Sequence, residues 1–589
     1  MGESRQRTTS GKRPWADTRE ERAETFPPGP ASAAELGNWP ENLVKSLTMP
    51  MGKVDFELCL RLRTNFNRQV VFSTEYSGFD CPREALRLAV EALQRVHSWH
   101  FPSDGAIKFT HSCDIASLPQ RVLVEIANSI DKGSTCVFAD LLQRLPPVAQ
   151  DYLAAAQPPA KAARQEKLEA NTEIANWLMA NKSWLFPPGA KSHCLAHQKE
   201  CQVYPDRQSQ SPEPAIASAA CPDPSSSPTA SSSTRGGKRI SQTKPLFVSC
   251  SGVSCLPWTS EGGSEGKASP CEVPHAVWLA ERVQLALEQR EDIFFLECTP
   301  QCPIKKVRDQ LKATHKIVYV VDGPELHGWP HRRRRLLAAA LNLKTVGWVG
   351  PASDAGIATD YGERFHRSTV VSGDVFMMAP DSELHAEYTR LAATRGFHID
   401  PAHVQDISQD ELLRMILPPG GVQRFRGWLE DYEKGSLGGT LLFDVDHNCN
   451  TKGSTSGSEW PVNLRHGSIF AARQVKAGVW QWRMGCPFEY LAAMGFHMYP
   501  GMSGAWGVSP LRGILEQYSA GQIQSLAGNG MHLVTQSAFM LYVLGNTVVK
   551  DSDKISASTR SGRDGGLGDS QVLSSQGSWE YHLQDDACV

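Results

Sequence analysis

Short apolar runs alternate with longer amphipathic segments over most of the chain. Runs rich in β-branched and aromatic residues predict strands at 70–73, 136–139, 246–248, 293–296 and 317–321. Pro82, which is favoured in the first turn of a helix, opens a predicted helix whose apolar face is formed by Ala85, Leu88, Ala89, Ala92, Leu93 and Val96. Strands that are apolar on both faces and alternate with helices predict an α/β fold with a mainly parallel sheet covered on both sides. In such a sheet, ligands bind beyond the carboxyl ends of the strands.

Three segments lack this pattern and are rich in charged, Ser, Gly or Pro residues. Residues 1–50 and the tail 551–589 are expected to be disordered. Residues 150–243 form a predicted insertion, which is helical at first and becomes a disordered linker from about residue 205. The remaining parts of the fold are expected at 65–149, 244–350 and 481–550, with a smaller region at 351–480.

The composition adds a few constraints. The chain has 589 residues, a net charge of −3 and 15 cysteines. This length allows one large domain with a smaller unit and tails, and cysteines without the spacing of small secreted domains suit a reducing compartment. Since no apolar run reaches about 18 residues and no signal-type apolar region occurs, we expect neither a membrane span nor secretion. Because the net charge is near zero, nucleic acid would have to bind to local basic patches.

Polar residues follow several of the predicted strands. The turn Tyr76-Ser77-Gly78-Phe79-Asp80 lies between the first strand and the first helix, where a glycine lets the backbone approach a ligand. Asp114 and Asp140 follow later strands, where one carboxylate can accept from ribose hydroxyls and the other from an adenine amine. Ordinary alternatives exist as well: a structural turn for Gly78, and a helix cap or a solvated loop for the two acids.

A cysteine follows the strand predicted at 246–248. In Gly252-Val253-Ser254-Cys255, the thiolate of Cys255 can add to C6 of cytosine and turn C5 into a nucleophile. The alternative is an ordinary buried thiol. Cys271 is a weaker candidate because no predicted strand presents it.

An acid and a run of arginines follow farther along the chain. Glu297 ends the apolar run 293–296, where a carboxyl group can hold cytosine N3 and the exocyclic amine. Arg333 and Arg335 belong to a run of arginines before a strand predicted at 336–339, so their alternation predicts two side chains on one face that hold a base oxygen and a phosphate. The alternatives are a structural ion pair for Glu297 and a nuclear localisation patch for Arg332–Arg335.

In their order along the chain, these segments resemble the motifs of the cytosine-C5 DNA methyltransferase family. The family's Phe-x-Gly-x-Gly corresponds to Tyr76-x-Gly78-x-Asp80, its Gly-x-Pro-Cys-Gln to Gly252-x-Ser254-Cys255-Leu256, and its Glu-Asn-Val to Glu297-Cys298-Thr299. Its Gln-x-Arg-x-Arg corresponds to His331-x-Arg333-x-Arg335, preceded by Gly328-x-Pro330. Two later segments also resemble motifs of the family: Glu489 with Met494-Gly495-Phe496, and Gly528-Asn529-Gly530-Met531.

The resemblance implies a Rossmann-like S-adenosylmethionine methyltransferase fold. It makes 65–149 the cofactor side of the methyltransferase domain, 244–350 the part with the catalytic loop, 481–550 its C-terminal part, and 351–480 a target-recognition region. It implies S-adenosylmethionine as the cofactor and DNA as the partner. The cofactor-binding residues that it implies are Tyr76, Gly78, Asp114, Asp140 and Asn529.

The same resemblance assigns the catalytic roles. Cys255 is the covalent nucleophile, Glu297 supports protonation at N3, and Arg333 and Arg335 hold the base and the backbone. The chain departs from the family pattern at Asp80, Ser254, Leu256 and Cys298-Thr299. Because the cysteine, the glutamate and both arginines are present, an active but divergent enzyme is favoured.

Two other functions remain open at this point. The tRNA cytosine-C5 methyltransferases share the motif set, so RNA is an alternative substrate. A methyltransferase-like protein that binds nucleic acid or partners without catalysis is the second alternative. A DNA substrate and Arg332–Arg335 indicate the nucleus, with the cytoplasm as the alternative, and no protein partner is indicated.

The insertion contains residues of a type that binds metals. The types and spacing of Cys194, His197 and Cys201 allow zinc to bind. No second Cys pair with standard spacing lies nearby, so no metal is assigned from the sequence.

Overall fold

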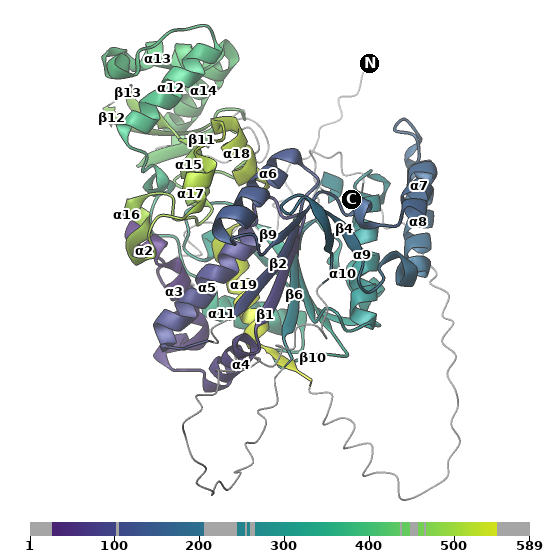
Figure 1. Cartoon of the computed structure of the whole chain (residues 1–589). Helices are drawn as coiled ribbons and strands as arrows, with labels where there is room; N and C mark the ends of the chain where they lie inside the picture. The colour runs from purple at the N-terminus through teal and green to yellow at the C-terminus, as the bar shows by residue number, and fades with distance from the viewer. Residues whose placement is uncertain are drawn as a thin grey trace, which may run out of the picture.

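A nine-stranded sheet forms the centre of the protein, in the order β5-β4-β3-β2-β1-β6-β7-β9-β8 (Figure 1). The computed structural model describes residues 26–101, 105–204, 244–253, 256–258, 266–435, 439–447, 457–464, 467–476 and 478–550. The strands are β1 (Val70–Glu75), β2 (Ile107–Cys113), β3 (Cys136–Phe138), β4 (Lys191–Cys194), β5 (Lys199–Gln202), β6 (Leu246–Gly252), β7 (Ile293–Cys298), β8 (His315–Asp322) and β9 (Arg335–Asn342).

The middle of this sheet is parallel. β3, β2, β1, β6 and β7 are parallel neighbours, whereas β9 runs antiparallel to both β7 and β8. The strand order reverses between β1 and β6, and the crevice outside the carboxyl ends at such a reversal is where open α/β sheets bind ligands. Every strand predicted between 70 and 339 lies in this sheet, so the predicted Rossmann-like, mainly parallel α/β fold is confirmed.

Helices cover both faces of the sheet (Figure 1). Ile293 and Phe295 of β7 belong to one hydrophobic core, and Phe294 and Leu296 belong to the other, because successive side chains point to opposite faces. The first core is shared with α3 (Trp39–Thr48), α4 (Phe56–Asn67), α5 (Cys81–His97) and α19 (Leu533–Gly545). The second is shared with α8 (Arg164–Leu185), α9 (Glu272–Leu287) and α10 (Ile304–Leu311).

The expectation of disorder over residues 1–50 is wrong for the part that the structure describes. Residues 26–50 include α2 (Ala33–Gly37) and α3, and the Trp39 indole N–H donates to the carbonyl of Gly495 at 2.9 Å. Leu43, Val44 and Leu47 of α3 are buried, at the spacing that packs one face of a helix into a core. The residues before 26 and the predicted tail 551–589 lie outside the described residues.

A smaller lobe projects beyond one end of the large sheet (Figure 1). It contains a three-stranded antiparallel sheet. Its elements are α12 (Asp381–Thr394), α13 (Gln409–Ile416), α14 (Pro419–Gly435), β11 (Thr440–Asp444), β12 (Ile469–Lys476) and β13 (Val479–Met484). The other elements of the chain are α6 (Ser117–Glu125), α11 (Asp354–Phe365), β10 (Val346–Trp348), α15 (Pro487–Ala493), α16 (Pro500–Ser503), α17 (Leu511–Leu515), α18 (Ala520–Asn529) and β14 (Thr547–Val549).

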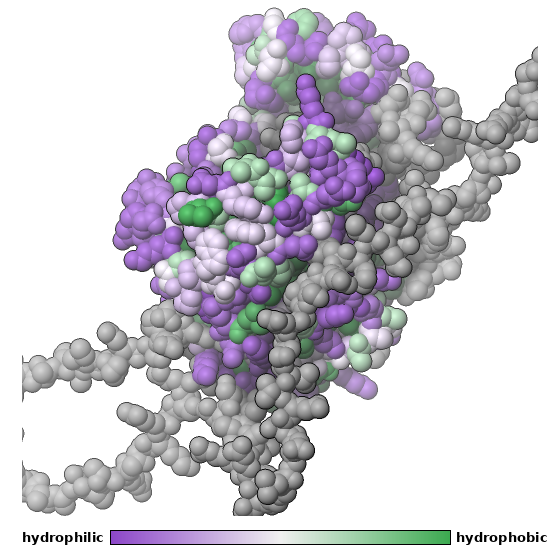
Figure 2. All heavy atoms as spheres, turned by 90° about the vertical axis from the view of Figure 1, so that its right-hand side faces the viewer, coloured by the Kyte–Doolittle hydropathy of each residue, from purple (hydrophilic) through white to green (hydrophobic). Residues whose placement is uncertain are grey.

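The predicted insertion packs against the large sheet. Its helical part is formed by α7 (Pro147–Ala156) and α8, after which the β4–β5 hairpin extends the sheet beyond β3. Figure 2 faces this side of the molecule, where hydrophilic residues dominate and hydrophobic ones are scattered between them. The linker predicted at 205–243 lies outside the described residues. Among the helices that the structure describes, none has the length and apolar character to cross a membrane.

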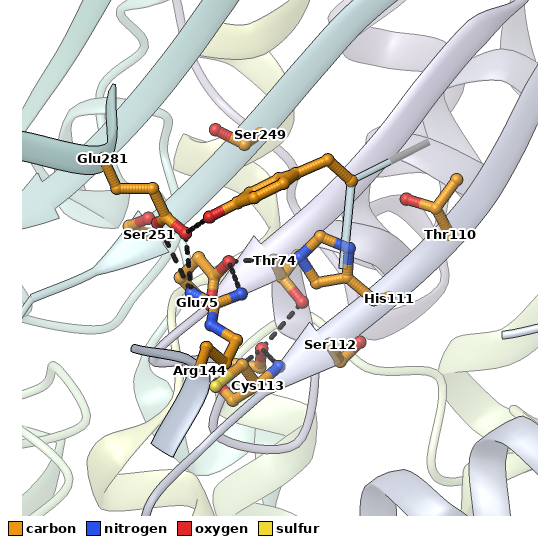
Figure 3. A network of polar contacts seen from close by, with 12 residues as sticks. Thr74, Glu75, Thr110, His111, Ser112, Cys113, Arg144, Ser249, Ser251 and Glu281 are labelled. Carbon is orange, nitrogen blue, oxygen red and sulfur yellow. Dashed lines mark hydrogen bonds and ion pairs between the residues drawn. The ribbon is translucent and has the colours of Figure 1, made fainter. Parts of the chain in front are cut away.

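A network of buried charges lies beneath the carboxyl end of β1 (Figure 3). Glu75, the last residue of β1, is fully buried and lies 2.9 Å from Arg144 and 3.1 Å from His111. Arg144 also reaches Glu281 of α9, at 3.2 Å, and Glu281 accepts a hydrogen bond from the Tyr204 hydroxyl. Burial raises the pKa of Glu75, but Arg144 and His111 together outweigh it and lower the pKa to about 2. The carboxylate therefore stays ionised inside the fold.

Arg144→Ala is expected to lower the free energy of unfolding by about 3–5 kcal/mol, because it removes the guanidinium closest to Glu75 and leaves Arg282, 3.9 Å from Glu75 and 2.6 Å from Glu281, as the remaining arginine that contacts both carboxylates. Urea-induced unfolding measures this loss. The control is Arg87→Ala, which removes a partly exposed pair with Glu84 at 2.8 Å and should lose no more than about 1 kcal/mol. Equal losses in the two variants would contradict the importance of the buried network.

Candidate active site

The loop after β1 is fixed to the end of β2. The Ser77 amide and hydroxyl donate to the Cys113 carbonyl at 3.0 and 3.1 Å, and the Ser77 hydroxyl accepts from the Cys113 amide at 3.0 Å. Gly78, at φ +55°, donates its amide to Asp114 Oδ2 at 2.8 Å. A side chain would strain this backbone conformation, so the conformation of the turn by itself explains why residue 78 is a glycine. The structure thus brings together Gly78 and Asp114, two of the predicted cofactor residues.

Asp80 occupies the position of the second glycine in the resembling motif. Its backbone is left-handed, with φ 67°, a region that Asp and Asn visit more readily than other non-glycine residues. Its buried carboxylate accepts from Thr74 Oγ1 at 2.9 Å and from Ser112 Oγ at 2.7 Å. Burial raises the pKa of Asp80. The substitution therefore keeps the turn that a glycine would allow, and adds a link between β1 and β2.

Asp114 and Asp140 both stabilise the turns in which they lie. Asp114 Oδ1 accepts from the Ala116 amide at 2.9 Å, and Asp140 Oδ1 accepts from the Leu142 amide at 3.0 Å. Since a carboxylate oxygen has two lone pairs, these bonds leave further acceptor capacity. Asp140 Oδ2 accepts no hydrogen bond from the residues that the structure describes. Neither acid is a helix cap, because the N-cap residues of the two helices that follow are Ala116 and Leu141, and acceptor capacity for a ligand contact remains.

The segment 528–531 closes over the loops after β1 and β6. A Cβ on Gly530 would lie 2.7 Å from Phe79 Cε1, and a Cβ on Gly252 would lie 2.6 Å from Met531 Cε. Both distances are shorter than van der Waals contact. Glycine at 530 therefore lets the C-terminal segment approach Phe79 so closely, whereas the flexible end of the Met531 side chain could move aside for a Cβ at 252.

The four arginines Arg332–Arg335 have different partners. Arg333 is buried, and its Nη2 donates to the carbonyls of Gly528 and Gly530 at 3.2 and 2.5 Å. The other three form ion pairs: Arg332 with Glu459, Arg334 with Glu325, and Arg335 with Glu297. Arg333 and Arg335 thus contact different groups, and the Arg332 and Arg334 side chains pair with acids of the fold while they stay 36 % and 35 % exposed.

Glu297 stands beside the end of β6. Gly252 and Glu297 are register partners in the β6–β7 pairing, and Glu297 Oε2 lies 4.0 Å from the position of a Cβ on Gly252. Arg335 Nε lies 3.0 Å from Glu297 Oε1, and the Glu297 side chain is 13 % exposed. A guanidinium thus holds a partly accessible carboxyl group at the strand end where the loop of Cys255 begins.

Cys255 itself, with Ser254, lies outside the described residues. On either side of them, Val253 and Pro257 are buried. After the loop, Asn171 of α8 is 3 % exposed and donates from Nδ2 to the carbonyls of Lys267 and Ser269 at 2.8 and 3.2 Å. The loop is therefore anchored by β6 at one end and by the insertion at the other. A single Asn in an amphipathic helix gives no sequence signal, so its contact could not be predicted.

The remaining resembling motif has a structural role. Glu489 is fully buried, and its carboxylate accepts from Arg483 at 2.6 Å and from the amides of Ala379 and Cys486 at 2.7 Å each. The ring of Phe496 stacks on Phe79 at a centroid distance of 5.1 Å. This motif therefore joins the smaller lobe to the loop after β1.

The predicted cofactor residues fit S-adenosylmethionine. The Tyr76 hydroxyl oxygen is buried without a hydrogen-bond partner among the described residues, and burial raises the pKa of this phenol, so it stays neutral. A Cβ on Gly78 would meet only the Asn529 carbonyl, at 3.9 Å. An aromatic residue, two carboxylates with spare lone pairs and a glycine turn are suited to a nucleoside carrying an amino acid.

Comparisons with known proteins find similarity among solved structures, but not among family models or curated proteins. No protein-family model and no curated protein matches the chain. Among solved structures, the methyltransferase EhMeth of Entamoeba histolytica is similar at 11 % identity and a TM-score of 0.36, over 81 % of this chain and 98 % of that chain. The Dnmt2 methyltransferase of S. pombe is similar at 10 % identity and a TM-score of 0.38, over 81 % and 98 % of the two chains. Such values carry no functional argument, so the chemistry has to be argued from the residues of this chain.

Asp80→Ala is expected to destabilise the protein more than Asp80→Gly, by about 1–2 kcal/mol, because alanine is strained in the left-handed region. Both variants leave the Thr74 and Ser112 hydroxyls without their acceptor, so both should be less stable than the wild type. Chemical denaturation of the three proteins tests the order. Equal stability of the Ala and Gly variants would show that the backbone at residue 80 is not constrained as described.

Proposed function

We propose that this protein is a divergent cytosine-C5 methyltransferase that acts on DNA with S-adenosylmethionine as cofactor. The observation that carries the proposal is the pairing of Gly252 with Glu297 across β6 and β7, with Arg335 3.0 Å from the Glu297 carboxyl. This arrangement sets an acid and a cation beside the loop of a candidate thiol nucleophile, at the edge where open α/β sheets bind ligands.

The proposed reaction uses groups of this chain in defined roles. Cytosine is flipped out of the helix, and the Cys255 thiolate forms a bond to C6. Glu297 donates a hydrogen bond or proton at N3, which stabilises the charge that develops on the ring. Bound S-adenosylmethionine supplies the methyl group to C5. The C5 proton then passes to a base from solvent, the C6–S bond breaks to release the Cys255 thiolate, and N3 returns its proton to Glu297, which restores the neutral aromatic ring.

The two arginines take different parts in this proposal. Arg335, through its contact with Glu297, orients the acid and lies where a base oxygen can be held. Arg333 acts as a positioning residue, because its contacts are the carbonyls of Gly528 and Gly530. These carbonyls flank Asn529, which is proposed to contact the cofactor together with Tyr76, Gly78, Asp114 and Asp140.

The parts of the chain take the roles that the resemblance implies. In the proposal, 65–149, 244–350 and 481–550 form the methyltransferase domain, and the lobe within 351–480 recognises the target. A DNA substrate implies a nuclear protein. Arg332–Arg335 are not used as support for that localisation, since each of their side chains forms an ion pair or a backbone contact.

Covalent trapping tests the nucleophile, the reaction and the polymer together. Wild type, Cys255→Ala and the control Cys271→Ala are each incubated with S-adenosylmethionine and DNA that contains 5-fluorocytosine, and in parallel with RNA. Fluorine at C5 blocks the final elimination, so an active enzyme stays attached to the base on a denaturing gel. We expect an adduct with DNA for the wild type and Cys271→Ala, and none for Cys255→Ala.

Each other outcome has a definite meaning. An adduct with RNA alone would replace the DNA proposal by the tRNA methyltransferase alternative. No adduct with either polymer, from folded protein, would favour a binding protein without catalysis. Loss of the adduct in Cys271→Ala but not in Cys255→Ala would move the nucleophile to Cys271.

Glu297→Gln is expected to reduce kcat by about 10²–10⁴-fold, the usual contribution of a general acid. Binding of S-adenosylmethionine, measured by calorimetric titration, should change little, because Glu297 is assigned to the base. The matched control is Glu325→Gln, whose carboxyl pairs with the neighbouring Arg334 at 2.7 Å and has no assigned role. If both variants kept the wild-type rate, Glu297 would not be the acid.

A further inference from the structure

A cluster of thiols and one imidazole lies at the edge of the large sheet, away from the candidate active site. Cys136, at the start of β3, lies beside Cys194, His197 and Cys201 of the β4–β5 hairpin. The four potential ligand atoms are all within 4.8 Å of one another. We propose that this cluster is a structural zinc site, with three thiolates and one imidazole as ligands.

The distances from nitrogen to sulfur match a tetrahedral site. His197 Nδ1 lies 3.5 Å from Cys136 Sγ, 3.4 Å from Cys194 Sγ and 3.3 Å from Cys201 Sγ. Zinc bonds of about 2.3 Å to sulfur and about 2.0 Å to nitrogen, at tetrahedral angles, place N and S about 3.5 Å apart. The nitrogen is therefore at ligand distance from all three sulfurs at once, which hydrogen bonding to a single thiol would not require.

Hydrogen bonds from neighbouring backbone groups favour metal binding by the imidazole and by one thiol. His197 Nε2 lies 2.8 Å from the Gly133 carbonyl oxygen. A carbonyl can only accept, so Nε2 carries the proton and the lone pair of Nδ1 points to the sulfurs. The Val137 amide donates to Cys194 Sγ at 3.3 Å, which favours a thiolate there. Such contacts orient the ligands of known metal sites.

The position of the cluster indicates what the metal does. β3 and β4 share one register pair, Phe138 with Cys194, besides a bond of 2.7 Å from the Leu195 amide to the Val137 carbonyl. A pairing as short as that of β3 with β4 holds the hairpin only weakly by itself. Zinc shared by Cys136 and the hairpin residues would join the insertion to the cofactor half of the sheet. Four protein ligands leave no open coordination position, so the site is structural and not catalytic.

Zinc content of the purified full chain, without an affinity tag that binds metals, tests the proposal. Elemental mass spectrometry is expected to find about one zinc per wild-type chain. Cys136→Ser and Cys201→Ser should lose most of this zinc after dialysis against a mild chelator. The matched control Cys271→Ser changes another half-buried cysteine outside the cluster and should keep it. Retention of zinc by Cys136→Ser, or its absence from wild type even after reconstitution, would overturn the proposal.

Two further measurements keep the test independent of folding defects and of the proposed reaction. Cobalt substituted into wild type should give the visible absorption of a tetrahedral thiolate site, whereas octahedral absorption would contradict it. Thiol titration of denatured, metal-free protein should find all cysteines reduced. A missing pair of thiols, restored by reductant, would show a disulfide within the cluster in place of zinc. The readouts need neither substrate nor S-adenosylmethionine, so they stand or fall apart from the methyltransferase proposal.

Discussion

The cost of burying the Glu75 carboxylate shapes the middle of this protein. An ionised group without access to water needs charged partners, and the chain supplies them from the turn after β3 (Arg144) and from β2 (His111). Tyr76 follows Glu75 directly, and Arg144 lies in the turn that begins at Asp140. The ion pairs that neutralise the buried charge therefore also fix two turns of the proposed cofactor site. Through Glu281, the same network reaches the helix layer on the face covered by α9.

The sequence predicts those features that depend on local periodicity. β1, β6 and β7 were predictable because both of their faces are buried, so each reads as a short apolar run. Glu297 was placed correctly at a strand end for the same reason. The alternation rule failed for Arg333 and Arg335 because β9 begins only at Arg335, so residue 333 lies before the strand and its side chain need not follow a period of two. The helix α3 was missed because the charged residues that precede it dominate the composition of 1–50.

Contacts between residues that are far apart in the sequence could not be predicted. The pairing of β3 with β4 brings Cys136 to Cys194, and nothing in their spacing indicates this. Asp80 is similar: the sequence shows only that it departs from a motif, whereas the structure shows its carboxylate between Thr74 of β1 and Ser112 of β2. A substitution in a motif has to be judged by where its side chain goes. The Asp80 carboxylate points into the sheet, so Asp80 in place of the family's glycine is compatible with a cofactor in the crevice.

The insertion between β3 and β6 is better understood as part of the architecture than as a spacer. A long connection costs little more free energy to close than a short one, so length alone requires no specific contacts. Yet the insertion makes three kinds of contact: the cluster at β3, the Tyr204 hydroxyl on Glu281, and Asn171 on the carbonyls of Lys267 and Ser269. The last two reach the buried charge network and the far end of the Cys255 loop. Because a buried Asn that satisfies two carbonyls is costly to replace, α8 is coupled to the loop that would present the nucleophile. Any change that loosens the insertion should therefore affect the candidate active site.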